Sequence, residues 1–570
     1  MRRVAFCFLP AVCFACSSLS DPLAINSSES ESTEPYVSNY SQDDEGDNID
    51  NVSFDRTITI TFSPSGSASV SGDEHGIVKV SGNDVTADNS AYDEKVLYRL
   101  TGSTSDGFFK LYSANKQAIV LDGVSITNGS GAAINNQSKK RTFVVLSGSN
   151  TLADGADYSD TPADEDEKAA FFSEGQLVFS GTGSLTVTAT GKAGITSDDY
   201  VRFLGSQTVS VKSSAGHGVR GKDAVVVSDG TLGITVSAAG KKGISSDGDV
   251  LFEGGKTTVS VSGAVDTSDS SDLSGSAGVK ADGVFTMKDG ALTITNTGKG
   301  GKGISGDQQA YFYGGSVKVT VSGANYGTSS SGGFGGPAGW GGNNSSDNSV
   351  AAKGIKFDGD IVIEGGSISA TASSHEAIES KGTISISGGT VYAKSSDDAI
   401  NSASHLTISG GLVCAWSTGN DGLDANGDMY IKGGVIYAVG SGGAEVALDA
   451  NTEGGHRLYI SGGTLFALGG LESGAQLTQN CYSASWNKSS WYALTVGSDT
   501  FAFKTPASGG SGLVVSGASK PGLKSGVSVS GGSSIFEGTG MTGATVTGGT
   551  DVSLSSYSGG NGGGMPGGRW

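Results

Sequence analysis

Carboxylates gather at turns in the second half of the chain, in a spacing that suits metal binding. Asp397-Asp398 and Asn420-Asp421 each stand before a short apolar phrase, and further acidic and amide residues follow it. Carboxylates about 5 Å apart repel one another unless a proton or a cation lies between them. Ca²⁺ takes six to eight oxygen ligands, which such side chains and nearby turn carbonyls can supply. We therefore predict calcium ligands, first Asp397, Asp398, Asp421 and Asp424, then Asp428 and Asp449.

Simpler interpretations stay open for these polar residues. Asp and Asn suit turns without any metal, because their side chains hydrogen-bond the local backbone, and no EF-hand spacing is present. Asp198-Asp199 and Gly216-His217-Gly218 resemble pieces of pectin-cleaving glycosidases, in which paired carboxylates serve inverting hydrolysis. His217 fills a position that carries lysine in other repeats, so we interpret this match as coincidence. The other histidines are scattered through turns and indicate surface positions: His75, His375, His405 and His456.

A sequence repeat must position these residues. A pair of glycines after an alternating apolar stretch recurs at steps of about 22 to 25 residues, for example at Gly365-Gly366 and Gly388-Gly389. A second phrase falls between the glycine pairs and consists of a small residue followed by Ile, Val or Leu. The residue before this second phrase is acidic in the later repeats. In the early repeats it is Lys or His: Lys192, His217, Lys242, Lys302 and Lys353.

The repeat predicts a stacked all-β fold. Each unit reads as two or three very short strands joined by tight turns, in which glycine supplies the positive φ. One unit cannot bury its apolar positions alone, but a stack of units can. We predict a right-handed parallel β-helix of roughly eleven coils, with an N-terminal cap and a C-terminal β segment. The main alternative, an antiparallel β-sandwich, does not predict one phrase repeating in phase.

The strand phase predicts a ladder of outward side chains in the last repeats. Val317, Val319 and Val321 alternate and face the core, so the residues at the intervening position face outward. The ladder has three interpretations: a platform for sugar rings, a protein contact, or a surface beneath the C-terminal segment. We favour the last, because a Cys414–Cys481 disulfide would hold that segment across the ladder. Trp340, in a glycine-rich insertion, is then a candidate for an exposed carbohydrate contact. The ladder residues are Tyr392, Cys414, Tyr437 and Phe466.

The N-terminus indicates export. Arg2 and Arg3 precede a short apolar stretch that ends at Ala15-Cys16, which is similar to a bacterial lipoprotein processing site. We predict that Cys16 is lipidated, that the chain is an outer-membrane or cell-surface lipoprotein, and that it meets the membrane through this anchor only. An ordinary cleaved signal is the alternative. The predicted divisions are a signal peptide 1–16, a disordered acidic tether 17–55, a β-helix 56–474 with an insertion 327–350, a covering segment 475–530 and a glycine-rich tail 531–570.

Composition narrows the possible partners. Of the 570 residues 94 are glycine, and 36 basic residues against 57 acidic ones give a net charge of −21. A chain of this balance does not neutralise phosphates, so we expect no nucleic-acid partner. The glycine pairs end strands rather than open helices, so they do not indicate a nucleotide site.

The order of these motifs resembles that of the bacterial carbohydrate-binding parallel β-helix proteins, first recognised as cellulose- and pectin-binding domains. The resemblance covers roughly residues 56–530 and is carried by four stretches: 157–173, 243–249, 376–427 and 461–476. It implies a right-handed parallel β-helix, calcium at acidic turns, and non-catalytic binding of plant-type polysaccharide, particularly acidic pectic chains.

One departure from the family pattern concerns the early repeats. The usual Asp-Asp-Gly-Ile turn of the family carries lysine or histidine here, so fewer calcium sites are expected in those repeats. As a hypothesis, Lys192, Lys242, Lys302 and Lys353 form a basic stripe that attracts uronates; the alternative is that they neutralise nearby aspartates. We expect calcium-dependent, non-catalytic binding of polysaccharide. The alternatives are a β-helical lyase or hydrolase acting on uronate-containing glycans, and a structural or adhesive surface protein.

Overall fold

The structure is a computed structural model that describes residues 36–40, 45–159, 161–327 and 349–559. The chain forms two compact units, Met1–Val37 and Ser38–Trp570, and nearly all described residues belong to the second. The predicted signal peptide, Cys16 and Trp340 lie outside the described residues. Within the described residues, no helix has the length and apolar character needed to cross a bilayer.

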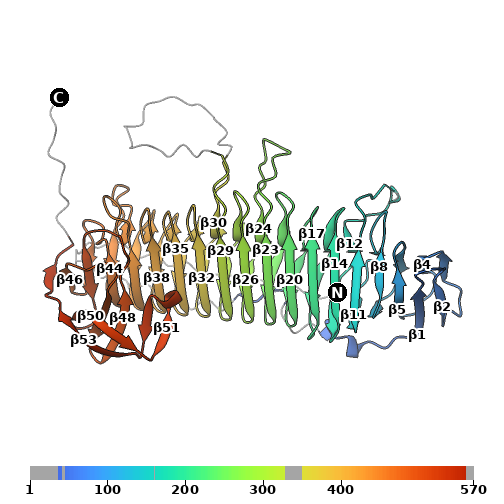
Figure 1. The fold of residues 1–570 in the computed structure, drawn as a ribbon, viewed down its shortest axis with the longest axis horizontal. Coiled ribbons are helices and arrows are strands. Elements are labelled where there is room, and N and C mark those ends of the chain that lie inside the picture. The colour runs from blue at the N-terminus through green and yellow to red at the C-terminus, as the bar shows by residue number, and fades with distance from the viewer. Residues whose placement is uncertain (1–35, 41–44, 160, 328–348, 560–570) are drawn as a thin grey trace, which may run out of the picture. The chain divides into compact units, whose positions relative to one another are not determined.

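Strands of the second unit stack as a parallel β-solenoid of about 15 turns (Figure 1). Each full turn places one strand on each of three faces, which we call A, C and B in chain order, and equivalent strands of adjacent turns pair in parallel. The register is regular, as in the column Val279, Ile304 and Ile355 on face B. The predicted parallel β-helix is confirmed. It has more turns than expected, because turns before Gly181 lack the glycine pair.

The strands of the three faces have the following bounds. Face A contains β5 (Val96–Thr104), β7 (Gln117–Asp122), β10 (Thr142–Ser147), β13 (Leu177–Gly181), β16 (Tyr200–Phe203), β19 (Ala224–Val227), β22 (Asp249–Phe252), β25 (Phe285–Met287), β28 (Ala310–Phe312), β31 (Ile361–Ile363), β34 (Ile384–Ile386), β37 (Leu406–Ile408), β40 (Met429–Ile431), β43 (Leu458–Ile460) and β45 (Gln476–Leu477). Face C contains β8 (Ser125–Thr127), β11 (Ser149–Ala153), β14 (Ser184–Ala189), β17 (Thr208–Ser213), β20 (Thr231–Val236), β23 (Lys256–Val261), β26 (Ala291–Asn296), β29 (Ser316–Val321), β32 (Ser367–Ala372), β35 (Thr390–Ser395), β38 (Leu412–Ser417), β41 (Val435–Val439) and β44 (Thr464–Leu468). Face B contains β4 (Asp84–Asn89), β6 (Phe108–Ser113), β9 (Ile134–Asn136), β12 (Ala169–Ser173), β15 (Ala193–Ser197), β18 (Val219–Gly221), β21 (Lys242–Ser246), β24 (Ala277–Ala281), β27 (Lys302–Gly306), β30 (Lys353–Phe357), β33 (Ile378–Ser380), β36 (Ile400–Ser402), β39 (Leu423–Ala425) and β42 (Leu448–Ala450).

Antiparallel strand pairs lie at the N-terminal end of the solenoid. Strand β1 (Arg56–Phe62) pairs with β2 (Ser69–Ser71), and β3 (Val78–Ser81) pairs with β4. The N-terminal cap that we expected over residues 56–98 stays a prediction.

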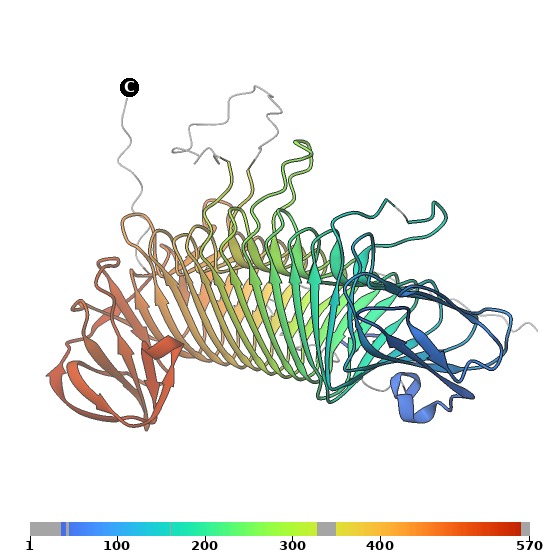
Figure 2. The ribbon, with the colours of Figure 1, turned by 45° about the vertical axis from the view of Figure 1, so that its right-hand side comes forward.

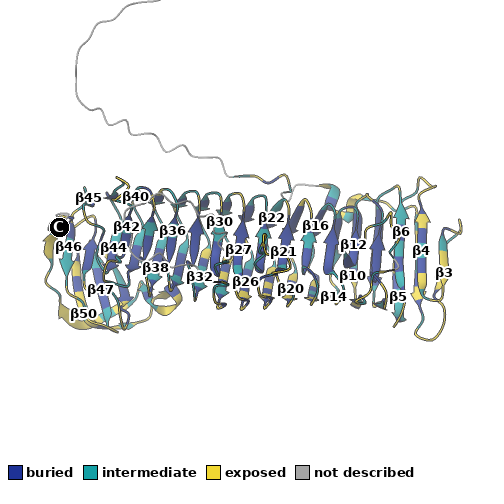
Figure 3. Cartoon of the chain, turned by 90° about the horizontal axis from the view of Figure 1, so that it is seen from above, coloured by how far each residue is buried: buried dark blue, intermediate teal, exposed yellow. Residues whose placement is uncertain are grey.

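The core lies between the three faces (Figure 3). Val317, Val319 and Val321 are each at most 1 % exposed, which confirms the predicted strand phase. Burial of one such side chain stabilises the fold by about 1.5 to 3 kcal/mol. Small residues are required beside the core column of face B, since a Cβ on Gly303 would lie 2.1 Å from Val319 Cγ1. The members of that column are at most 1 % exposed: Val219, Ile244, Val279, Ile304, Ile355, Ile378, Ile400, Leu423 and Leu448.

Part of the predicted tether folds onto face A. Two short 3₁₀ helices, η1 (Glu45–Asp47) and η2 (Ile49–Asn51), lie in a segment that we call the strap, residues 45–55. Ile49, Val52 and Phe54 pack against a buried cluster that includes Phe143. The prediction of a disordered tether is therefore wrong for the strap, because its apolar residues cover an apolar column on the outward side of face A.

The C-terminal region covers the outward ladder of face C (Figure 2). Tyr437 and Phe466 are fully buried and pack against Tyr492 and Phe503. This confirms the preferred interpretation of the ladder. A six-stranded antiparallel sheet supplies the cover: β47 (Trp491–Val496), β48 (Asp499–Lys504), β50 (Gly522–Ser530), β51 (Ser533–Ile535), β52 (Gly540–Thr542) and β53 (Thr545–Asp551).

The glycine-rich tail is folded over residues 533–557. Besides β51, β52 and β53, this stretch contains η3 (Phe536–Gly538) and β54 (Ser555–Tyr557), and Phe536 is buried against the ladder. Of its glycines, Gly543 lies between β52 and β53, whereas Gly548 and Gly549 lie within β53.

The predicted disulfide is also wrong, since Cys414 and Cys481 are both free and buried. Cys414 lies on β38, and Cys481 lies on β46 (Cys481–Ala484), with β41, β44 and β49 (Leu513–Ser516) paired in between. Four strand spacings amount to about 19 Å, whereas a disulfide needs Cα atoms closer than about 7 Å. The two thiols also belong to different apolar clusters, Cys414 to the covered ladder and Cys481 to the solenoid core.

Candidate functional site

Two columns of side chains face outward along face B. The parallel pairing passes from Lys242–Ala277 to Ile244–Val279 without pairing the glycines between them. Both the small residue and the following aliphatic residue turn inward, so the positions on either side of them turn outward. The residues that precede the small residue in successive turns form one column, which we call the first column. The residues that follow the aliphatic residue form the second column.

The charge of these columns reverses along the stack. The first column reads Ala193, His217, Lys242, Ala277, Lys302, Lys353, Glu376, Asp398, Asp421 and Val446. The second column reads Thr196, Arg220, Ser245, Lys280, Ser305, Lys356, Glu379, Asn401, Asp424 and Asp449. We call the part from β18 to β30 the basic half and the part from β33 to β42 the acidic half.

The predicted basic stripe is confirmed in part. Lys242, Lys302 and Lys353 belong to one column, with Ala277 between the first two. Lys192 does not belong to it, since Ala193 takes the column position. Lys192 instead lies over the ring of Tyr158, with Nζ 4.5 Å from the ring centroid, and donates to Glu167 O at 2.5 Å.

A cavity of about 500 Å³ opens at the start of the basic half. His217 lines it, and its Nδ1 accepts the Lys242 backbone N–H at 3.0 Å. Burial, followed by the charges of Lys242 and Lys241, lowers the pKa of His217 to about 3, so the ring is neutral and carries its proton on Nε2. The charged residues of the lining are Lys168, Lys192, Arg220 and Lys241. Among the described residues that line this cavity there is no carboxylate.

A second cavity of about 240 Å³ lies farther along the basic half. Four lysines line it together with two aspartates, Asp272 and Asp307. Lys280 pairs with Asp282 at 2.8 Å and with Asp307, and Lys356 pairs with Asp358. The other two lysines, Lys242 and Lys302, have no carboxylate partner among the described residues. We call this space the lysine cavity.

Lys353 joins the two halves. Its Nζ lies 3.0 Å from Glu376 Oε2 and also pairs with Glu379. It therefore takes the neutralising role that was the alternative to a free basic stripe. Lys381 pairs with the other oxygen of Glu379, so that carboxylate is shared between two cations.

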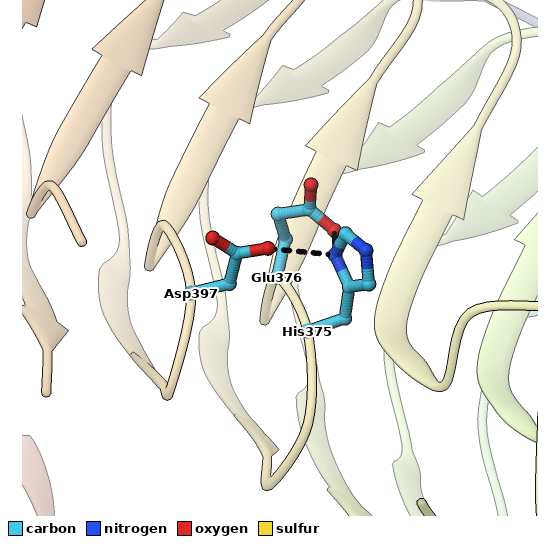
Figure 4. A group of neighbouring side chains, drawn as sticks. All are labelled: His375, Glu376 and Asp397. Carbon is cyan, nitrogen blue, oxygen red and sulfur yellow. Dashed lines mark hydrogen bonds and ion pairs between the residues drawn. The ribbon is translucent and has the colours of Figure 1, made fainter. Parts of the chain in front are cut away.

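His375, which we expected at the surface, stands beside this junction and is partly buried (Figure 4). Its Nδ1 contacts Glu376 and lies 3.0 Å from Asp397 Oδ2. Burial lowers its pKa, but the contacts with Asp397 and Glu376 outweigh burial and raise it to about 9. The imidazolium therefore holds two carboxylates of adjacent turns together. The three ligand atoms lie within 4.8 Å of one another, a separation that a metal ion could also bridge.

The acidic half gathers most of the predicted calcium ligands. Asn401 Nδ2 donates to Asp398 Oδ2 at 3.1 Å and to Asp424 Oδ2 at 2.6 Å, and the Asp421 N–H donates to Asp398 Oδ1 at 3.0 Å. Asp449 pairs in register with Asp424 on the next strand. We call Asp398, Asp421, Asp424 and Asp449 the acidic cluster.

Burial and like charge weaken ionisation in the acidic cluster. Burial and then Asp424 raise the pKa of Asp398 to about 7, and burial and then Glu376 and Asp397 raise that of Asp424 to about 6. The pKa values of Asp421 and Asp449 are also raised, first by burial. No cationic side chain of the described residues offsets this repulsion within the cluster.

Asp428 lies apart from the cluster, at the turn before β40. Its backbone N–H donates to His405 Nδ1 at 2.9 Å, and its carboxylate accepts the Arg457 N–H at 2.9 Å and the Tyr430 hydroxyl at 3.0 Å. These contacts tie the turn to its neighbours on face A rather than to face B.

A family model described as carbohydrate-binding domain-containing protein matches residues 81–399, which include both cavities and the junction at Lys353. No curated protein matches the chain. A solved structure of a polysaccharide lyase-like protein from C. thermocellum is 22% identical and has a TM-score of 0.32, over 47% of this chain and 95% of that one.

Proposed function

Because this chain belongs to the family of carbohydrate-binding domain-containing proteins, we propose that it binds polysaccharide without cleaving it, along the outward side of face B. One observation carries this assignment: the two cavities lie in succession on one face, within the matched residues. Equivalent positions recur at every strand spacing of about 4.8 Å, which suits a polymer lying across the strands. A chain of sugars would meet a similar set of contacts at each turn.

The charge of the basic half supports an acidic polysaccharide as the ligand. The whole chain has a net charge of −21, yet cations are concentrated on this part of face B. Such local complementarity attracts an anionic polymer and fixes its position. Plant cell-wall pectin is one polysaccharide of this class.

Calcium dependence forms part of the proposal. The acidic cluster offers oxygen ligands only, which suits Ca²⁺, and its raised pKa values are those expected of carboxylates that lack a compensating cation. Asp398, Asp421, Asp424 and Asp449 would hold the ion, and Asp397 stands next to them. The ion would supply positive charge to an otherwise acidic surface, where a polymer carboxylate could then approach.

Display at the cell surface completes the proposal. The Ala15-Cys16 step after a basic and apolar N-terminal stretch supports lipidation of Cys16 and export to the outer membrane or cell surface. Radiolabelled fatty acid is expected to label the chain, and Cys16→Ser is expected to abolish the label.

Eliminative cleavage of a uronate polymer is the second candidate function. Burial lowers the pKa of Lys302 to about 8, so part of this lysine is neutral near physiological pH and can accept a proton, as a general base must. Release of unsaturated uronate from polygalacturonate, followed by absorbance, distinguishes a lyase from a binding protein.

A glycan array probed with the full chain, with calcium and with EDTA, tests the proposal. Retention on acidic polysaccharides that EDTA weakens is the expected result. Absence of retention on any glycan would favour a structural or adhesive role with protein partners.

A further inference from the structure

We propose that the lysine cavity is the seat of one acidic group of the polysaccharide, a carboxylate or a sulfate, held between Lys242 and Lys302. This inference rests on the proposed binding of polysaccharide by face B and names the chemical group that it recognises. The cavity, its lining and the pairing of its charges carry the argument.

The charges of the lysine cavity are not balanced. Of its four lysines, Lys280 and Lys356 are neutralised by aspartates at their sides. Within the part of the chain that the structure describes, Lys242 Nζ donates to two neutral acceptors, Gly240 O at 2.6 Å and Ser274 Oγ at 2.8 Å. Lys302 Nζ has no hydrogen-bond partner among the described residues. Two cations thus remain without a counter-charge in one small space.

Keeping two buried lysines charged without a counter-charge is unfavourable in free energy. A charged group removed from water needs a partner of opposite charge, or it is driven toward its neutral form. Burial, followed by neighbouring lysines, lowers the pKa of both Lys242 and Lys302 to about 8. Asp266 and Asp282 act in the opposite direction on Lys242, and Glu379 does so on Lys302, but they do not restore the ordinary value.

The groups that face these two lysines come from every strand around them. Lys280 and Asp282 belong to β24 and the turn after it, Lys353 and Lys356 to β30, and Glu379 to β33. Asp272 and Ser274 reach the cavity from the loop before β24, and Asp307 follows β27. Asp282 and Asp307 pair with Lys280, and Glu379 pairs with Lys353 and Lys381. Asp272 is exposed to solvent. An anion from outside the protein is the counter-charge that the cavity lacks.

A bound anion makes binding depend on protons. It favours the charged form of both lysines and so raises their pKa toward 10.5, with uptake of protons at pH values near 9. Since the free lysines lose their charge as pH rises through about 8, affinity falls roughly tenfold between pH 7 and pH 9 for each lysine required. Ordinary surface lysines would keep their charge over this range.

The experiment compares polygalacturonate, the same polymer fully methyl-esterified, and a sulfated polysaccharide, each titrated into the full chain by calorimetry. Titrations at pH 9 in two buffers of different ionisation enthalpy report the protons taken up. Lys302→Gln and Lys242→Gln are the test variants. Lys256→Gln is the matched control, because Lys256 is an exposed residue of β23 on face C.

The proposal is supported if an acidic polymer binds with uptake of protons. Either cavity variant should then lose about tenfold or more in affinity, and Lys256→Gln should lose none. A preference for polygalacturonate identifies the group as a carboxylate, and a preference for the sulfated polymer identifies it as a sulfate. Equal binding of the esterified polymer, or unchanged affinity in both cavity variants, overturns the proposal and leaves polysaccharide binding by face B intact.

A further measurement separates failure of this proposal from failure of the proposed function. Nuclear magnetic resonance of ¹³C-labelled lysine side chains gives the pKa of Lys302 with and without galacturonate. A pKa near 8 that rises with galacturonate supports the cavity even if no polymer is retained. A pKa near 10.5 in the free chain overturns it.

Discussion

Lys353 Nζ lies 3.0 Å from Glu376 Oε2, across adjacent turns of the solenoid, and this contact is where face B changes from basic to acidic. At the junction the charges neutralise one another, through Lys353, His375 and Lys381. Away from it they do not. Among the described residues, Lys242 and Lys302 on one side have no carboxylate partner, and the acidic cluster on the other side has no cationic partner.

Calcium is expected to stabilise the chain through the acidic cluster. Calcium at concentrations well above its Kd should raise Tm by about 5 °C, because an ion that binds only the folded state stabilises that state by mass action. Thermal unfolding monitored with a fluorescent dye measures the change in Tm. Asp421→Asn and Asp424→Asn should remove most of the rise.

Asp428→Asn is the matched control for calcium, because Asp428 has the same residue type but lies outside the cluster. Its Tm rise with calcium should equal that of the unaltered chain. An unaltered chain whose Tm does not respond to calcium or EDTA would contradict the calcium assignment.

The acidic cluster is also expected to make stability depend on pH in EDTA. The folded chain binds protons at Asp398 and Asp424 more tightly than the unfolded chain, since their pKa values are raised to about 7 and about 6. Stability from these groups is therefore fully present below about pH 4 and is lost as pH rises through about 7. Thermal unfolding between pH 4 and pH 8 should show this fall, and calcium should abolish it. A Tm that rises over this range in EDTA would argue against the cluster.

The strap is expected to depend on one buried carboxylate. Asp47 is 2 % exposed and pairs with Arg141 Nε at 2.9 Å and Arg202 Nε at 2.7 Å. Asp47→Ala leaves both guanidinium groups without this partner and should weaken docking of the strap by about 3 to 5 kcal/mol. Hydrogen exchange of the amides in residues 45–55 measures the effect. Asp50→Ala, an exposed change in the same segment, should alter exchange by little; equal effects of the two changes would contradict a specific buried contact.

The cover over face C is expected to be held by its aromatic cluster. Phe466 is fully buried and packs against Tyr437, Tyr492 and Phe503. Phe466→Ala should lower the free energy of unfolding by about 3 to 5 kcal/mol. It should also lower the urea concentration at which half of the molecules release residues 475–559. Limited proteolysis at increasing urea concentration reports this release. Phe501→Ala, at a half-buried position of the covering sheet, should have a smaller effect, and the reverse order would contradict the packing described.

The two internal cysteines are expected to be thiols. Alkylation under denaturing conditions without reductant should modify Cys414 and Cys481 in full, as read by mass spectrometry of their peptides. In the folded chain both should react slowly, because both are buried and burial raises the pKa of each thiol. Linked peptides that appear only without reductant would restore the disulfide.

The sequence predicted the features that follow from periodicity. A parallel stack, inward Val317, Val319 and Val321, and an outward ladder that ends up covered all depend on one phrase repeated in phase, and the structure has each of them. The alignment of Lys242, Lys302 and Lys353 follows from the same register. Residues that recur at one position of a repeat need no information beyond the chain itself.

Features that depend on where non-repeating segments lie were not predictable in this way. The strap has the polar composition of a tether, and only Ile49, Val52 and Phe54 signal that it packs against face A. Cys414 and Cys481 suggested a disulfide because the number of strands between them in space cannot be read from their spacing in sequence. His375 was assigned to the surface because Asp397, its partner besides the adjacent Glu376, meets it only when successive turns stack.

Co-sedimentation of the full chain with insoluble pectin and cellulose, with calcium or EDTA, tests the central claim most directly when the supernatant is also assayed for released uronate. The account predicts that the chain sediments with pectin in calcium, less so in EDTA, and that no soluble uronate appears. A chain that stays in solution with every polysaccharide, or one that releases uronate as it binds, would contradict it.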